Sequence, residues 1–344
     1  MKAAFITGHG GNEVVEVRTC EPAVRQPGEV LIRVEAATLN QVDLYMRNSG
    51  AGITHRLPQI MGLDAAGVIE EVDASETMLK LGQSVAVHPG ITCGRCEFCQ
   101  RGEGVLCTKM QLLGEHRDGT FAQWISVPAQ NVFPMPQGLS FAQAAAMGVN
   151  YLTAWRMLFT KAQIKPWETA LIFGIGGGVS LAAMQIAKAI GVKVIVTSRE
   201  DSKLQRALAM GAEYGINSQT QDVAKAVLSY TGGRGVDVVI ENVGEAVWPM
   251  AMKSLVRGGR LVTCGATTGD QPPADLRRIF IRQLQILGST HGDFSEFRAL
   301  LSFVEKSEIA PVIDSEFPLD RIHDALTRLE SGQQFGKIAL NLAG

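Results

Sequence analysis

The chain has 344 residues, of which 46% are hydrophobic and 19% charged, with a formal net charge of -2 at pH 7. These values are typical of a globular protein, and the near-zero charge without a block of Lys or Arg excludes a nucleic-acid binder or a membrane-surface protein. The length indicates two domains of about 100 to 200 residues each.

The N-terminal segment Met1–Thr7 has neither the apolar core nor the cleavage site of a secretory signal. No apolar run reaches the roughly 18 residues that a membrane-spanning helix needs. We therefore expect a soluble, cytoplasmic protein.

From about residue 1 to 90, apolar and polar residues alternate, as in Val30–Ala36 and Gly67–Val72, with Gly and Pro between the segments. Alternation with a period of two is typical of half-buried strands. This region is predicted to be a mostly β, barrel-like domain.

Four of the six cysteines, Cys93, Cys96, Cys99 and Cys107, lie within fifteen residues, at spacings of three, three and eight. In a reducing compartment such a cluster favours a metal over disulfides. Four thiolates close a tetrahedral site without an open position, so the predicted metal is one structural zinc per chain. Disulfides and unpaired reduced cysteines are the alternatives.

From about residue 147 to 288, short apolar strands alternate with helices, as in a parallel sheet wound on both faces. Six strands match a complete dinucleotide-binding fold. The predicted strands are Thr169–Gly174, Lys193–Thr197, Glu213–Ile216, Val236–Glu241, Arg260–Cys264 and Leu284–Gly288. The last stretch, with a helix over Ser295–Ser307 and a strand near Lys337–Leu342, is expected to return to the first domain.

The first predicted strand of this sheet runs into Gly174-Ile175-Gly176-Gly177-Gly178-Val179-Ser180 and then into an apolar helix. This order predicts a dinucleotide site, because residues without side chains let a pyrophosphate reach the amides at the helix N-terminus. A strict G-x-G-x-x-G would put Val179 at the third glycine, so we favour a frame from Gly174 through Gly177 to Ser180. A tight structural turn is the alternative.

The ribose of the cofactor is expected at the end of the second strand, about 20 residues after the glycine turn. Ser198 and Arg199 stand there, with Lys203 one turn along the next helix. A hydroxyl and a guanidinium match a 2'-phosphate better than a hydroxyl pair, so NADP(H) is predicted. Glu200 and Asp201 keep NAD(H) open.

The cysteine lobe and the glycine turn together resemble the zinc-containing alcohol dehydrogenase and quinone oxidoreductase branches of the medium-chain dehydrogenase/reductase superfamily, over the whole chain. The resemblance implies an α/β protein with a GroES-like β-barrel catalytic domain and a Rossmann doubly wound parallel sheet. The catalytic domain would comprise residues 1–146 and 289–344, with the zinc lobe at 90–110, and the Rossmann domain residues 147–288. It also implies a homodimer or homotetramer.

The segments that carry a catalytic zinc in the alcohol dehydrogenases differ in this chain. Where those enzymes begin one segment with a cysteine, this chain has Asn40, and where they have Gly-His-Glu it has Gly62-Leu63-Asp64. Too few ligands are left for the usual site of three ligands and a water. The patterns around Asn40 to Arg47 and from Gly62 instead resemble the quinone oxidoreductases.

The resemblance also implies cofactor contacts beyond the glycine turn. Thr153 is similar to the threonine near the nicotinamide, and Lys337 to the basic residue that reaches the pyrophosphate. Strand-end turns that would surround the nicotinamide contain Asn242, Val243, Gly265 and Ser289.

These features predict a reductase that uses NADPH and a small-molecule substrate, without a catalytic zinc. Without a Lewis acid, a conjugated acceptor is favoured, because hydride addition to it leaves an enolate that one or two hydrogen bonds stabilise. The acceptor would be an enone, a quinone or an enoyl thioester, with Tyr45 and Asn40 as candidate donors. For Tyr45, the alternative is an aromatic side chain that lines the pocket without a chemical role. For the whole protein, the alternatives are a zinc-dependent alcohol dehydrogenase that uses Asp64 and a histidine, and a non-catalytic NADPH-binding protein. His116 is interpreted as a surface-loop residue, with a role as a pocket residue or an acid as the alternative.

Overall fold

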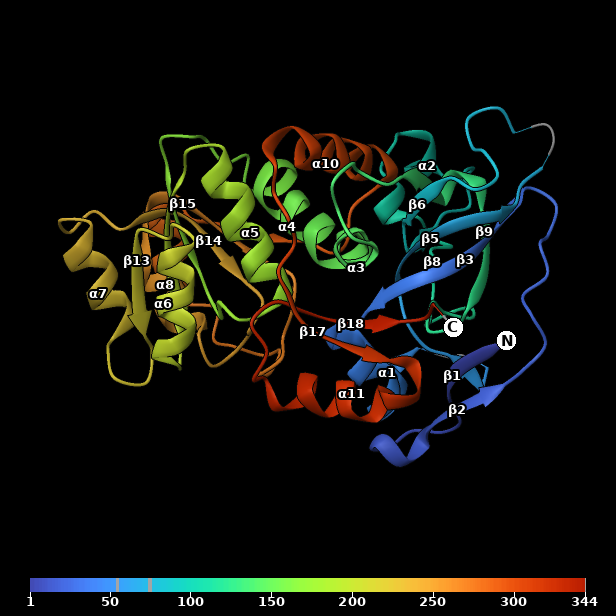
Figure 1. Ribbon diagram of the computed structural model, residues 1–344. Coiled ribbons are helices and arrows are strands. Elements are labelled where there is room, and N and C mark those ends of the chain that lie inside the picture. Colours follow the sequence, from blue (N-terminus) through green and yellow to red (C-terminus); the bar gives the residue numbers. More distant parts are fainter. Residues whose placement is uncertain (54–55, 74–75, 344) are drawn as a thin grey trace. The chain divides into compact units, whose positions relative to one another are not determined.

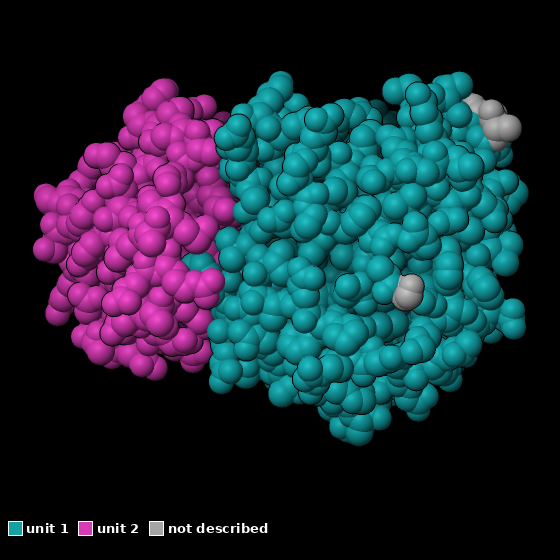
Figure 2. All heavy atoms as spheres, in the orientation of Figure 1, with its two compact units in different colours: residues 1–152, 292–344 teal, residues 153–291 magenta. Residues whose placement is uncertain are grey.

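The computed structural model describes residues 1–53, 56–73 and 76–343. The chain forms two compact units, coloured separately in Figure 2. Unit 1 comprises Met1–Leu152 and Gly292–Gly344, and unit 2 comprises Thr153–His291. The chain therefore enters unit 2 six residues later, and leaves it three residues later, than the sequence pattern predicts.

Unit 1 is built mainly of antiparallel strands (Figure 1). Its three-stranded sheet has the order β2-β1-β4, from Val15–Thr19, Lys2–Ile6 and Gln59–Ile60. A larger sheet has the order β10-β6-β5-β3-β18-β17, and β9 also pairs with β3. Its strands are β3 (Glu29–Thr38), β5 (Asp64–Glu71), β6 (Ser84–Val87), β9 (Trp124–Pro128), β10 (Val132–Pro134), β17 (Ile313–Pro318) and β18 (Lys337–Asn341).

Strand β3 is the centre of unit 1, because it pairs with β5, β9 and β18. Its alternating Val30, Ile32 and Val34 are fully buried in the core, as the period of two predicts. Gly67 on β5 permits the close approach of β3, since a Cβ there would lie 2.1 Å from the Arg33 carbonyl oxygen.

Short helices connect the strands of unit 1. The α-helices are α1 (Gln41–Ser49), α2 (Glu97–Gln100), α3 (Phe141–Ala145), α10 (Phe294–Ser307) and α11 (Ile322–Ser331). The 3-10 turns are η1 (Asn12–Val14), η2 (Gly50–Gly52), η3 (Gly104–Leu106), η4 (Ala129–Asn131) and η7 (Leu319–Arg321). A π-helical turn, η5 (Met147–Tyr151), leads into α4 (Leu152–Trp155), where unit 1 ends at Leu152, and the rest of α4 with a second π-helical turn, η6 (Arg156–Lys161), starts unit 2.

Unit 2 contains a six-stranded parallel sheet in the order β13-β12-β11-β14-β15-β16. This is the doubly wound order of a dinucleotide-binding fold, which confirms the predicted α/β class. Its strands are β11 (Thr169–Ile172), β12 (Lys193–Ser198), β13 (Tyr214–Asn217), β14 (Val236–Glu241), β15 (Leu255–Thr263) and β16 (Gln285–Gly288). Its helices are α5 (Gly178–Ala189), α6 (Asp201–Ala209), α7 (Val223–Tyr230), α8 (Trp248–Ser254) and α9 (Leu276–Arg282).

The two faces of this sheet are covered by different helices. Leu171, Ile195 and Val239 face a core that they share with Val227 of α7 and Ala251 of α8. Helices α5 and α6 contact β11, β12 and β13. All six predicted strands are present, and the largest difference is at β15, which starts at Leu255 rather than at Arg260 because Leu255 already pairs with Val236.

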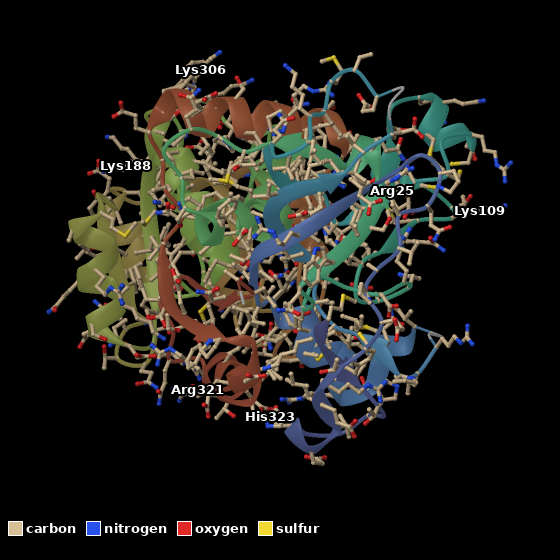
Figure 3. All side chains as sticks on the ribbon, turned by 45° about the vertical axis from the view of Figure 1, so that its right-hand side comes forward. Arg25, Lys109, Lys188, Lys306, Arg321 and His323 are labelled. Atoms are coloured by element: carbon tan, nitrogen blue, oxygen red, sulfur yellow. The ribbon has the colours of Figure 1, made fainter. Side chains whose placement is uncertain are left out.

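Among the described residues, no helix is long and apolar enough to span a bilayer. Exposed basic side chains labelled in Figure 3, such as Lys109, Lys188 and Lys306, come from a loop, from α5 and from α10. Positive charge is thus distributed over separate elements, in line with the small net charge.

Candidate active site

A cluster of buried polar side chains lies where β3, β5 and β18 of unit 1 meet. The carboxylate oxygen Oδ2 of Asp64 accepts hydrogen bonds from Thr38 Oγ1 at 2.7 Å, Asn40 Nδ2 at 2.9 Å and Lys337 Nζ at 3.1 Å. Strand pairing explains the convergence, since Thr38 is paired with Asp64 on one side and with Ala339 on the other. Three segments far apart in the sequence thereby place their polar groups around one carboxylate.

Lys337 is 3% exposed, and its ammonium group has three acceptors in this cluster. It donates to the Leu39 carbonyl oxygen at 2.7 Å, to Asn40 Oδ1 at 2.6 Å and to Asp64 at 3.1 Å. An ammonium group has three protons, so all of them are used within unit 1. The resemblance assigns Lys337 to the cofactor pyrophosphate, but in this structure such a contact would require one of these bonds to be given up.

Asn40 occupies the N-cap of α1, and both ends of its side-chain amide are engaged. Its Oδ1 accepts from Lys337 and, at 2.8 Å, from Asn150 Nδ2, while its Nδ2 donates to Asp64 and, at 3.4 Å, to the Thr38 carbonyl oxygen. The side chain is 3% exposed. Asn40 therefore organises the cluster, and its role as a donor to substrate stays a prediction.

A second carboxyl group, that of Asp43, belongs to the same region. It accepts the backbone N–H of Asn40 at 2.6 Å, which is one half of a capping box for α1. Burial raises the pKa of Asp43 to about 8. The hydrogen bond from the Asn40 backbone lowers this pKa, and the negative charge of Asp64 raises it further. Burial also lowers the pKa of Lys337, and the charge and hydrogen bond of Asp64 oppose that shift.

These residues do not fit a catalytic zinc. Asn40 and Leu63 replace the cysteine and histidine, the Leu63 side chain is fully buried and offers no ligand atom, and Asp64 is already bound to an ammonium group. Within residues 1–53, 56–73 and 76–343, the four cysteines are the one group of three or more His, Cys, Asp or Glu side chains close enough to share a metal ion.

Two further polar residues of unit 1 were not anticipated from the sequence. The first is Glu115, which is 4% exposed and whose pKa is raised by burial to about 7. Its neighbour His116 is exposed, as the sequence predicts. Asn150 is half-buried and touches Asn40 from η5. Neither belongs to a motif with a recognisable spacing. Tyr45 is half-buried on α1.

The glycine turn of unit 2 connects β11 to α5. Gly174 has a φ of +66°, which favours glycine, and its carbonyl oxygen accepts the N–H groups of Gly176 and Gly177. Helix α5 then begins at Gly178, with Val179 half-buried in its first turn. Ser180 is fully buried and donates to the Phe173 carbonyl oxygen at 2.6 Å, the close packing expected of the third small residue.

The predicted nicotinamide contacts of unit 2 gather at the carboxyl edge of the same sheet. Asn242 Nδ2 donates to Ser180 Oγ at 3.1 Å, and a Cβ on Gly265 would lie 3.0 Å from the Asn242 carbonyl oxygen. The Ser289 N–H donates to the Thr263 carbonyl oxygen at 2.9 Å, and the Ser289 hydroxyl is buried without a partner among the described residues. Thr153 is 6% exposed on α4.

A buried acid that the sequence did not single out holds these turns in place. Glu241, at the end of β14, accepts the N–H groups of Val243 and Gly244 and, at 3.0 Å, the hydroxyl of Thr263. Burial raises its pKa. The ends of β14 and β15 are therefore fixed relative to each other, which positions the turn around Asn242 and Val243.

The residues predicted to read the ribose differ in availability. Ser198 ends β12, and its hydroxyl accepts the N–H of Glu200 at 3.0 Å. Lys203 is 7% exposed and its ammonium donates to Glu200 Oε1 at 2.7 Å, whereas Arg199 is exposed. Arg199 is therefore the better placed of the two cations to meet a phosphate.

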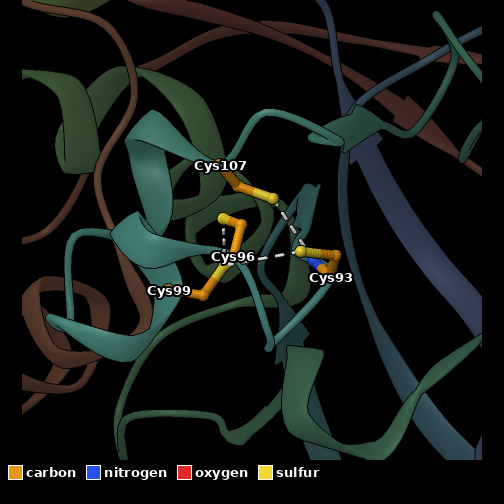
Figure 4. A group of neighbouring side chains, drawn as sticks. All are labelled: Cys93, Cys96, Cys99 and Cys107. Atoms are coloured by element: carbon orange, nitrogen blue, oxygen red, sulfur yellow. Dashed lines mark hydrogen bonds between the residues drawn. The ribbon is translucent and has the colours of Figure 1, made fainter.

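The four cysteines form a compact lobe in unit 1 (Figure 4). Cys96 Sγ lies 3.5 Å from Cys99 Sγ, which lies 4.0 Å from Cys93 Sγ, and all four sulfur atoms lie within 4.8 Å of one another. A tetrahedral zinc with Zn–S bonds of about 2.3 Å requires sulfur separations of about 3.8 Å. Backbone N–H groups of Cys99 and Thr108 lower the pKa of Cys96 to about 6. The donor set and its geometry fit a structural zinc.

Known proteins resemble both units of this chain. Residues 26–137 match the family described as alcohol dehydrogenase GroES-like domain, and residues 178–306 match zinc-binding dehydrogenase. An alcohol dehydrogenase of Geobacillus stearothermophilus is 31% identical, over 99% of this chain and 100% of its own length, and a quinone oxidoreductase of Mus musculus is 30% identical over 99% and 98%. A crystal structure of an NAD-dependent alcohol dehydrogenase superposes with a TM-score of 0.95 at 38% identity, over 99% of each chain.

Relatives of both kinds are oxidoreductases, which supports a nicotinamide cofactor for this chain, and the four thiols support a structural zinc. The GroES-like domain, the parallel sheet and these relatives agree with one another. The chain belongs to the medium-chain dehydrogenase/reductase superfamily.

Proposed function

We propose that this protein is an NADPH-dependent reductase that reduces an activated alkene or a quinone without a catalytic zinc. The observation that carries the proposal is the ammonium group of Lys337, which binds Asp64 and Asn40 at the two positions of the chain that correspond to zinc-binding segments of the alcohol dehydrogenases. The ammonium group of Lys337 is already paired with Asp64 there, so a divalent ion would have to displace it.

Without a Lewis acid, negative charge on the reduced substrate must be stabilised by hydrogen bonds and by the fixed charge of Lys337. When bound, the nicotinamide supplies the hydride. A conjugated carbonyl suits this site because the charge is delocalised as an enolate, whereas a simple ketone concentrates it as an alkoxide. In the proposal Tyr45 donates to the substrate oxygen or relays a proton, and Asn40 keeps the donors of the cluster in place.

Steady-state oxidation of NADPH with a panel of enones, quinones and enoyl thioesters tests the function. We expect turnover with at least one conjugated acceptor and none with the matching saturated ketones. Turnover of saturated ketones or alcohols alone would favour a zinc-dependent alcohol dehydrogenase, which the alcohol dehydrogenase relatives keep as the second candidate. Cofactor binding without any turnover would identify a non-catalytic NADPH-binding protein.

Arg199 is proposed to read the 2'-phosphate of NADPH. A charge-assisted hydrogen bond contributes about 1.5 to 3 kcal/mol, so Arg199→Ala should lower kcat/KM for NADPH by about 10- to 100-fold and change that for NADH little. The measurement is kcat/KM with both cofactors. Lys225→Ala on the exposed face of α7 is the control, since Lys225 carries the same charge away from this turn. An equal loss with NADH would contradict the assignment.

We further propose a homodimer or homotetramer assembled through the edge of the parallel sheet. Strand β16 is an edge strand, and α9, which precedes it in the chain and contacts β15, exposes Leu276, Phe280 and Ile281, with Phe280 69% exposed. An unpaired edge next to exposed apolar residues is a surface that association would cover. Phe280→Asp should therefore shift the species measured by sedimentation toward the monomer, whereas Trp167→Asp, at another exposed aromatic, should not.

A further inference from the structure

The polar cluster of unit 1 fixes the orientation of two amides. Lys337 can only donate hydrogen bonds, so the Asn40 atom 2.6 Å from its ammonium group must be the oxygen. The Asn40 nitrogen then faces Asp64, and the Asn150 atom 2.8 Å from the Asn40 oxygen must be a nitrogen. The direction of each hydrogen bond from Lys337 to Asn150 follows from chemistry alone.

With the hydrogen bonds in this direction, Asn40 has no amide proton left to donate to a substrate. Both N–H bonds of its amide point at acceptors within the cluster, and the side chain is almost fully buried. Asn150 differs in both respects. Its amide nitrogen carries two protons, one of which meets Asn40, and no second acceptor is present among the described residues. Its side chain is half-buried and therefore accessible from outside the cluster.

The backbone that carries Asn150 is held directly on the cluster. Asn150 lies in η5, a π-helical turn of the kind that often occurs at functional sites. Two residues earlier, a Cβ on Gly148 would lie 2.6 Å from Asp64 Oδ1, so the turn approaches this carboxylate as closely as glycine allows. Asp64 Oδ1 itself is buried and has no hydrogen-bond partner within the described part of the chain.

From these contacts we infer that Asn150, and not Asn40, donates the hydrogen bond to the carbonyl oxygen of the substrate, and that Asn40 is a positioning residue. The inference rests on the proposed reductase function. A bound reduced nicotinamide would supply hydride to the β-carbon of the alkene. The alkene π pair would then form the double bond between the α-carbon and the carbonyl carbon, the C=O π pair would move to the oxygen to give an enolate, and a proton from water, which Tyr45 can relay, would be added at the α-carbon. Asn150 stabilises that oxygen, and Lys337, bonded to the same Asn40 oxygen, adds a nearby positive charge.

The experiment compares Asn150→Leu, which removes the donor, with Asn150→Ser, which retains a shorter one. Loss of one donor to a developing oxyanion costs about 100- to 1000-fold in kcat. We expect Asn150→Leu to show such a loss with an enone, while the Kd for NADPH from fluorescence titration and the thermal midpoint stay unchanged. Asn150→Ser should recover at least about tenfold of the lost kcat.

The inference would be overturned if Asn150→Leu kept the wild-type kcat, or if the Leu and Ser variants lost equal amounts of activity. In either case, turnover by the wild-type protein would still support the reductase function. A loss accompanied by weaker NADPH binding or a lower thermal midpoint would also overturn it, because the effect would then be structural. If the wild-type protein reduces no conjugated acceptor, the proposed function and this inference fail together.

Discussion

Lys337→Met is expected to destabilise unit 1 by about 3 to 5 kcal/mol at neutral pH, the usual cost of removing one partner from a buried ion pair. Asp64 is 0% exposed and Lys337 3% exposed, so water cannot replace the lost ammonium without opening the sheet. The carbonyl oxygen of Leu39 and the Oδ1 atom of Asn40 would lose their hydrogen-bond donor at the same time. Denaturation by urea, followed by circular dichroism, measures the change.

Two controls separate the ion pair from general effects of the substitution. Lys306→Met on exposed α10 should change stability by less than about 0.5 kcal/mol. The double variant Lys337→Met with Asp64→Asn should be more stable than Lys337→Met alone, because it no longer buries an unpaired charge. A single variant as stable as the wild type would show that the cluster is not charged as described.

Cys107→Ser should abolish the structural zinc and lower the thermal midpoint of the protein. Structural zinc binds with an apparent free energy of about 10 kcal/mol or more in small domains. Unit 1 has its own hydrophobic core, so only part of this binding free energy contributes to its stability against unfolding. We expect the free energy of unfolding to fall by about 2 kcal/mol or more, which corresponds to a decrease in the thermal midpoint of about 4 to 8 °C. Zinc analysis and calorimetry on the same sample provide the measurement.

The matched control is Cys20→Ser, since Cys20 lies outside the lobe and is half-buried. It should retain the zinc and the wild-type midpoint. If Cys107→Ser also retained one zinc per chain, the four-sulfur geometry described here would not be the binding site.

The fold could be predicted largely because its signals are local. The six parallel strands follow apolar runs bounded by glycines, and the glycine turn and the cysteine lobe each lie within fewer than twenty residues. Differences arose where pairing extends a strand beyond its apolar run, as at Leu255. Such extensions depend on a neighbouring strand and leave no pattern in the segment itself.

The site could be predicted only in part, because its partners come from distant segments. The sequence identified Asn40 and Lys337 separately, yet their 2.6 Å contact joins positions 297 residues apart. Asn150 and Glu115 have no motif, and their importance appears only once β3, β5 and η5 are placed together. Lys203 had the right charge at the right spacing, but its pairing with Glu200 depends on side-chain geometry.

The central claim is that the reaction takes place without a second metal ion, and zinc content measured alongside turnover tests it most directly. Purified protein should contain one zinc per chain, and kcat for a conjugated acceptor should remain constant while a strong chelator is titrated up to the point at which the structural zinc begins to leave. Two zinc ions per chain, with turnover lost as the first of them is removed, would contradict the account.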